Sequence, residues 1–179
     1  MFIKQGVALQ HLIDEFHHRL GQLVSWFTLI MVLVTLLIVV LRYGFNLGWV
    51  AMQESVMYLH VAVFLLGAAH TLNVNEHVRV DIFYRKMSKR KQAMVDIMGT
   101  LLLLMPVNFL IFFLSFDYVI NAWALMESSP EAGGLPLVFI LKSFILVFAI
   151  TMNLQGLAEL IRNVLLFKGT AASSIEVPA

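Results

Sequence analysis

The side chains best suited to chemistry lie in the hydrophilic segment EHVRVDIFYRKMSKRK, between two long apolar runs. His77, Arg79 and Asp81 stand at alternate positions there, where they could form a metal site, a proton relay, an ion pair or a docking contact. A protein metal site uses three or four ligands, and this stretch supplies His77, Asp81 and at best Glu76 or His70. We therefore expect a structural role, in which Arg79 and Asp81 hold a turn through ion-pair and backbone hydrogen bonds.

Charged side chains also stand at or inside the apolar runs. Arg42 and Glu54 flank a short connection, and we expect them to be interfacial anchors, paired with each other or in contact with a partner subunit. Lys142 lies inside an apolar run, from which its stem can reach outward. It either pairs with Glu54 or Asp117 or touches a partner protein or lipid headgroup. Without an acid beside it in the membrane, it is a poor proton relay.

His60 lies within another apolar run, on the same helical face as Gln53. A buried histidine can be an axial haem ligand, but a b-type cytochrome needs histidine pairs that face each other from different helices. The other histidines lie outside clear span interiors, so we expect His60 to make a hydrogen-bonded helix contact. Asn108, two residues after Pro106, is expected to bond the carbonyl that the proline frees or a neighbouring helix.

The composition is that of a membrane protein. The chain has 179 residues, of which 60% are hydrophobic and 13% charged, and its mean hydropathy is +0.87. A soluble fold of this size cannot bury so much apolar surface. The absence of cysteine excludes disulfides, thiolate catalysis, iron–sulfur clusters and a thiol-based disulfide oxidase. We expect a protein that is not an enzyme, holds no cofactor or metal, and binds no nucleic acid.

Four apolar runs are each long enough to cross a bilayer, whose ~30 Å hydrocarbon core needs about 20 helical residues. Because lipid offers the backbone no hydrogen bonds, each run must be a helix. We therefore predict an all-α membrane protein, with a single four-helix domain over 1–168 and a disordered tail at 169–179. The four transmembrane helices are predicted at about 20–41, 50–75, 95–117 and 135–160.

Basic residues are distributed unevenly between the two sides of the predicted membrane. Ten of the 12 Lys and Arg residues precede the first span, lie between the second and third, or follow the fourth. Arg42 lies on the opposite side and Lys142 inside a span. The positive-inside rule therefore places the N- and C-termini in the cytoplasm. We expect the basic run 85–91 to hold its loop against anionic lipid headgroups.

The segment 9–20, before the first span, has the spacing of an amphipathic helix. Its apolar and polar residues fall on opposite faces: Leu9, Leu12, Ile13, Phe16 and Leu20 on one, and Gln10, Asp14, Glu15, His17 and His18 on the other. We expect either a short interfacial helix on the inner membrane surface or a simple extension of the first span.

Four blocks, in order along the chain, resemble the small, Q-type membrane subunit of tripartite ATP-independent periplasmic (TRAP) transporters. They are VLRYGFNLGWVAMQESVMYLH at 40–60, HVRVDIFYRKMS at 77–88, GGLPLVFILKSFI at 133–145 and NLQGLAELIR at 153–162. The likeness extends over about residues 12–166. The last two blocks are most similar to the subgroup assigned to mannitol, chloroaromatic or 2-oxo-acid uptake.

The resemblance implies a small accessory subunit, in the bacterial inner membrane, of a sodium-coupled, binding-protein-dependent secondary transporter for organic acids. Its stable partner would be a much larger membrane subunit, which binds sodium and the substrate and moves as an elevator. A periplasmic solute-binding protein would deliver the substrate through transient contacts, and membrane lipids would surround the complex. The small subunit would scaffold and stabilise the large one. Its structural or partner-interface candidates are Arg42, Glu54, His60, His77, Arg79, Asp81 and Lys142.

Two other classes of protein remain open from the residues alone. A membrane-anchor subunit of a redox complex, binding haem or quinone, would use His60. A homo-oligomeric small exporter would need an intramembrane acid, for which Glu54, close to Trp49 at the interface, is the only candidate. Nothing in the sequence encodes the transported substrate.

Overall fold

The structure is a computed structural model that describes residues 2–77, 84 and 86–168. Its described elements are α1 (Phe2–Phe45), α2 (Val50–Asn73), α4 (Lys89–Gly99), η1 (Thr100–Leu104), α5 (Met105–Ala124) and α6 (Val138–Phe167). The π-helical turn η1 joins α4 and α5 without a break, so the three form one rod over 89–124.

Four of these units are long and apolar enough to cross a membrane: α1, α2, the α4–η1–α5 rod and α6. For the described residues, the prediction of an all-helical protein with four helices able to span a membrane is therefore confirmed. Large apolar side chains on α1 and α5, such as Leu36, Phe113 and Leu114, point outward rather than into the bundle. Outward apolar faces of this extent are suited to lipid and not to water.

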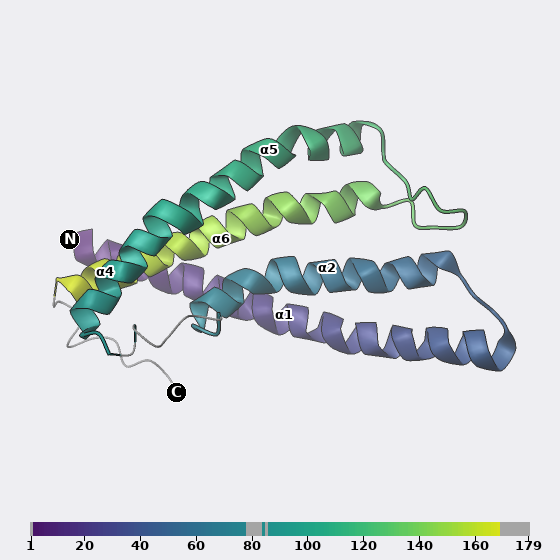
Figure 1. Ribbon diagram of the computed structural model, residues 1–179, viewed down its shortest axis with the longest axis horizontal. Coiled ribbons are helices and arrows are strands. Elements are labelled where there is room, and N and C mark those ends of the chain that lie inside the picture. Colours follow the sequence, from purple (N-terminus) through teal and green to yellow (C-terminus); the bar gives the residue numbers. More distant parts are fainter. Residues whose placement is uncertain (1, 78–83, 85, 169–179) are drawn as a thin grey trace.

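Successive units run antiparallel (Figure 1). α6 lies centrally and packs against α1, α2 and the α4–η1–α5 rod. α1 begins and α6 ends at the same end of the bundle, which we call the terminal end. The opposite end carries the connections 46–49 and 125–137, and we call it the loop end.

Small residues make the closest contacts between the helices. Ala69, Ala149 and Ala158 are fully buried. A Cβ on Gly156 would lie 2.7 Å from the Leu104 side chain, so the glycine lets the third span approach α6. Close approach of this kind is how helices gain dispersion energy in a bilayer, where lipid tails are as apolar as the side chains.

The third span contains its π-helical turn one residue before Pro106. Proline has no N–H, and a π turn is one way in which a helix adapts to an interrupted hydrogen-bond ladder. Asn108 is buried, and its Nδ2 donates to the Leu104 carbonyl at 2.8 Å. The amide thus bonds a carbonyl of its own helix and not a neighbouring helix.

α1 runs without interruption from Phe2 to Phe45, so residues 9–20 extend the first span and do not form a separate interfacial helix. The helix ends at Phe45, and the next residue, Asn46, adopts a left-handed φ of 53°. Asparagine tolerates this conformation better than most residues. Leu47 N then donates back to the Leu41 carbonyl at 3.0 Å, which satisfies one of the last carbonyls of the helix.

Candidate functional site

Polar side chains from three helices converge at the terminal end. The carboxylate of Asp14, on α1, accepts hydrogen bonds from Arg162 Nη2 at 2.9 Å and from Gln155 Nε2 at 3.1 Å, both on α6. The backbone carbonyl of Asp14 accepts a bond from Asn73 Nδ2 at 3.0 Å, at the last residue of α2. We call Asp14, Asn73, Gln155, Glu159 and Arg162 the terminal network.

Arg162 supplies the positive charge of the terminal network. Its Nη1 donates to Glu159 Oε1 at 2.8 Å, and its Nη2 also lies 3.4 Å from Asn73 Oδ1. The side chains of Asp14 and Arg162 are only 20% and 19% exposed, so both charges are largely withdrawn from water. Removing Arg162 would leave the charges of Asp14 and Glu159 uncompensated, which is strongly destabilising. The network therefore fixes how α1, α2 and α6 meet.

The terminal network follows from matching spacings on two helices. Polar residues recur at i, i+4 and i+7 on both: Gln10, Asp14 and His17 on α1, and Gln155, Glu159 and Arg162 on α6. Gln10 and His17 are buried, whereas Leu12 and Phe16 are 69% and 51% exposed. In residues 9–20, the part of the polar face that holds Gln10 and His17 packs against protein together with Ile13, whereas Glu15 and His18 are exposed.

Beside the terminal network, α1 and α2 approach closely at Gly21. A Cβ at this position would overlap the His70 ring, so glycine is the residue that leaves room for it. The ring of His18 lies on the same side, with its centroid 5.7 Å from that of His70. The contact brings the two helices together one to two turns from Asp14.

At the loop end, Glu54 ties the start of α2 to the connection that leads into α6. Its carboxylate accepts hydrogen bonds from Leu135 N at 2.6 Å and from the Ser129 hydroxyl. Ala51 N donates to the Gly133 carbonyl at 3.2 Å and strengthens the same contact. We call this set of contacts the loop clamp. In the loop clamp a carboxylate accepts a hydrogen bond from a backbone N–H of the loop, whereas the terminal network joins side chains of different helices.

Lys142 does not have the predicted ionic partner. Its Nζ lies 2.5 Å from Glu127 Oε2, and neither Glu54 nor Asp117, the partners expected from the sequence, takes that place. The ammonium also lies 3.8 Å from the centre of the Tyr118 ring, within range of a cation–π contact. Glu127 lies nearer to Lys142 than the expected acids because the loop folds back beside the start of α6. There the backbone carbonyl of Glu127 accepts a hydrogen bond from Val138 N at 3.1 Å.

Within the described chain, His60 makes no hydrogen-bonded contact with another helix, so the expected helix contact stays a prediction. The side chain is exposed on the outward face of α2, and its ring centroid lies 4.6 Å from that of Phe64 on the same helix. The reason is geometric, because other faces of α2 pack against α1 and α6. Among the described residues, no ring contact pairs His60 with another histidine, so the structure gives His60 no axial haem partner.

The other predicted residues lie at the ends of the helices. Arg42 is exposed near the end of α1 and, in the described part of the chain, does not form the predicted ion pair across the connection 46–49. His77 Nε2 lies 3.2 Å from the Ala68 carbonyl, which anchors the segment after α2 to that helix. Arg79 and Asp81 fall outside the described residues, so their ion pair stays a prediction.

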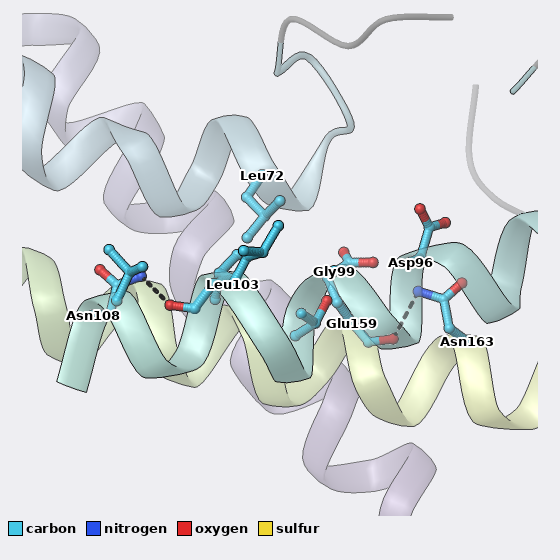
Figure 2. Close-up of a pocket in the computed structure, with 10 residues that line it drawn as sticks. Leu72, Asp96, Gly99, Leu103, Asn108, Glu159 and Asn163 are labelled. Atoms are coloured by element: carbon cyan, nitrogen blue, oxygen red, sulfur yellow. Dashed lines mark hydrogen bonds between the residues drawn. The ribbon is translucent and has the colours of Figure 1, made fainter. Parts of the chain in front are cut away.

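A pocket of about 460 Å³ lies beside the terminal network, between the end of α2 and the α4–η1–α5 rod (Figure 2). Leu72 contributes to its apolar wall, and Asp96, Glu159 and Asn163 contribute polar groups. Both acids have partners in the protein, since Tyr84 donates to Asp96 Oδ2 at 2.5 Å and Glu159 belongs to the network. In the part of the chain that the structure describes, no three His, Asp or Glu residues gather as metal ligands.

The residues that join the helices were not among those predicted from the sequence. The polar face of 9–20 placed Asp14 at a surface, and neither Gln155 nor Arg162 was expected to be its partner. Their shared i, i+4, i+7 spacing and opposite charges are a signal that could have identified them. Glu54 was recognised as important, but its partners include a backbone N–H, for which side-chain types provide no signal.

Comparison with known proteins identifies related sequences. A family model for the DctQ component of tripartite ATP-independent periplasmic transporters matches residues 7–166. A similar protein of Haemophilus influenzae carries the name "Putative TRAP transporter small permease protein" and is 31% identical over 104 residues. The aligned part covers 57% of this chain and 65% of that relative, which is less than two thirds of its length. No solved structure matches the chain.

Proposed function

The chain belongs to the DctQ component family of tripartite ATP-independent periplasmic transporters, and on this premise we propose that it is the static scaffold of its transporter. Members of this family are transporter components and not enzymes, and they work with a large membrane subunit and a periplasmic binding protein. The proposed role is to stabilise that large subunit in the membrane. Sodium and the substrate bind to the partner.

One observation supports the scaffold role above others. The charged groups of the terminal network bond one another and hold helices of this chain together. Asp14 contacts both α2 and α6, and Arg162 contacts both Asp14 and Glu159. A transport site needs polar groups left available to a substrate or ion near the middle of the membrane, often at broken helices. The described spans instead offer a fixed set of antiparallel helices with apolar outer faces.

We propose that the protein lies in the bacterial inner membrane, with both termini in the cytoplasm. The four spans support a multi-pass arrangement, and the unequal distribution of Lys and Arg supports this orientation. The terminal network then lies toward the cytoplasm and the loop clamp toward the periplasm. In this orientation the connection 125–137 is the part of the chain best placed to meet the periplasmic binding protein.

The proposed transporter takes up an organic acid and is driven by a sodium gradient. Both statements derive from the likeness to TRAP small subunits. The similarity of residues 133–162 to the mannitol, chloroaromatic or 2-oxo-acid subgroup is part of that likeness. The H. influenzae relative is named for the TRAP class and carries no substrate in its name. A binding screen of the companion periplasmic protein against labelled carboxylates would identify the substrate.

The scaffold role is tested by reconstitution in cells that lack endogenous uptake. The large subunit and binding protein are expressed with and without this chain, and sodium-driven uptake of the identified carboxylate is measured. We expect uptake to be lost without this chain, whereas carboxylate binding by the periplasmic protein is unchanged. Full uptake by the large subunit alone, at matched membrane abundance, would contradict the proposal.

The redox-anchor alternative is not favoured, because His60 faces outward without a second histidine opposite it in the described structure. A visible absorption spectrum of the purified chain separates the two functions. We expect no Soret band, and a stoichiometric haem signal would overturn the scaffold assignment.

A further inference from the structure

An outward stripe on α2 combines polar and apolar residues and extends from the start of the helix past its middle. Gln53, Met57, His60 and Phe64 are all exposed, and they recur at i, i+4, i+7 and i+11, which places them on one helical face. We call these residues the α2 stripe. Met57 and Phe64 are 47% and 65% exposed, so the stripe protrudes from the bundle and is not covered by α1 or α6.

His60 stands near the middle of the bilayer whichever way the protein is oriented. It is the eleventh of the 24 residues of α2, so it lies about 15 Å along the helix from the first residue and slightly farther from the last. The hydrocarbon core is ~30 Å thick, so neither end of α2 brings His60 to a headgroup region. An imidazole, with a shorter side chain than lysine or arginine, cannot reach an interface from this depth.

Hydrocarbon provides no hydrogen-bond partner for the His60 ring. The ring packs against Phe64, which is apolar, and the described residues provide no hydrogen bond to its nitrogens. A polar group in this position is costly if it faces lipid, and ionisable residues in membrane spans almost always face protein or a water-filled space. The outward direction of His60 therefore indicates that protein covers this face.

The outward faces of α1 and α5 differ from the α2 stripe in this respect. Thr35 is a polar residue on the exposed face of α1, but its Oγ1 donates to the Met31 carbonyl at 2.7 Å and needs no external partner. On α5, the exposed face at the same depth consists of apolar residues such as Leu110, Phe113 and Leu114. Neither face carries an ionisable side chain at the depth of His60, so both suit lipid, whereas the α2 stripe suits a protein helix.

We propose that the α2 stripe seats a transmembrane helix of the large subunit. This inference rests on the proposed function, and it deepens that function by locating the interface on this chain. The partner helix presents a hydroxyl or amide side chain to the His60 ring, since such groups supply the hydrogen bond that lipid lacks. Small residues on the same partner face would receive the protruding Met57 and Phe64 side chains.

Site-specific photocrosslinking in native membranes tests the location of the interface. A benzophenone amino acid replaces Phe64 in one variant and Phe113 in a matched control, because both are exposed phenylalanines in a span, at 65% and 69%. We expect an adduct with the large subunit from position 64 and none from position 113. Equal adducts from both positions, an adduct from position 113 alone, or an adduct between two copies of this chain would overturn the inference.

Substitution of His60 by leucine tests the chemistry of the interface. We expect His60→Leu to lower the yield of large subunit that copurifies with this chain several-fold, and to leave the melting temperature of the isolated chain unchanged or higher. Thr35→Leu, on the α1 face, should alter neither measurement. A lower melting temperature of isolated His60→Leu with an unchanged complex would refute the proposal, because it would assign His60 to the fold of the chain itself.

The wild-type chain separates the failure of this inference from the failure of the proposed function. If the wild-type chain does not copurify with the large subunit, the proposed function is wrong and the inference falls with it. If a complex forms but position 64 yields no adduct while position 113 does, the scaffold role stands and the location on α2 is wrong.

Discussion

The two ends of the bundle are held by different kinds of contact. At the terminal end, charged and amide side chains of α1, α2 and α6 bond one another directly and are largely withdrawn from water. At the loop end, one carboxylate bonds a hydroxyl and a backbone N–H of a connection, and a lysine pairs with a partly exposed glutamate. The terminal network therefore determines the packing of helices, whereas the loop clamp determines the shape of one loop. Substitutions at the two ends should therefore differ in how much stability they remove and in how much of the chain they affect.

The largest effect is expected from breaking the terminal network. Asp14→Ala leaves Arg162 with Glu159 as its remaining acid, and removes acceptors from Gln155 as well. We expect a loss of about 2–3 kcal/mol in the free energy of unfolding, since Arg162 and Gln155 lose their charge-assisted hydrogen bonds to a largely buried carboxylate. Thermal unfolding of the purified chain in detergent measures it.

The exposed pair Arg19–Glu15, on the same helix, is the matched control for Asp14→Ala. Its side chains are 77% and 56% exposed, so Arg19→Ala should change the free energy of unfolding by no more than about 0.5 kcal/mol. Equal effects of the two substitutions would mean that the terminal network contributes no more than a surface ion pair.

A second, smaller loss is expected where α1 approaches α2. Gly21→Ala places a Cβ against the His70 ring and forces the helices apart, at a cost of about 1–2 kcal/mol. At the loop end of α1, a Cβ on Gly44 would meet no atom of the described residues within 4 Å, so Gly44→Ala should not lower the melting temperature. If Gly44→Ala lowered the melting temperature and Gly21→Ala did not, the close helix contact would lie at the loop end and not at Gly21.

Loss of the loop clamp should act locally. Glu54→Ala removes the acceptor for Leu135 N and the Ser129 hydroxyl, which we expect to cost about 1–2 kcal/mol. Hydrogen exchange should rise in 125–137 while α1 and α6 near the terminal network stay protected. Glu54→Gln retains an acceptor and should cause a smaller rise. Exchange that increases along the whole of α6 would show that the clamp also holds the helices together.

The smallest effect is expected from the ion pair between Lys142 and Glu127. Lys142→Met retains a long apolar stem and leaves Glu127, whose side chain is 36% exposed, accessible to water. We expect a change in melting temperature smaller than that of Glu54→Ala. A larger loss than that of Glu54→Ala would make this pair, and not the loop clamp, the main contact of the loop end.

The predictable part of the fold came from the hydrophobic runs, because the bilayer forces each long uncharged segment to be a helix. The pairing of Asp14 with Arg162 was not predictable in the same way, since 148 positions separate the two residues and either could have served at the membrane surface. Lys142 had several acids within reach, and only the fold of the loop selects Glu127. The outward direction of His60 depends on which faces of α2 the other helices occupy, which periodicity within one helix does not reveal.

The unequal lengths of the helices determine how the protein meets membranes of different thickness. At ~1.5 Å per residue, α1, with 44 residues, measures about 66 Å, whereas α2, with 24 residues, measures about 36 Å and nearly matches the hydrocarbon core. α2 is also the helix that Asn73 holds at one end and Glu54 at the other. The length of this shortest span thus determines which bilayer thickness suits the bundle. We expect hydrophobic mismatch in a thinner bilayer to tilt α2 together with α1 and α6, to which Asn73 joins it.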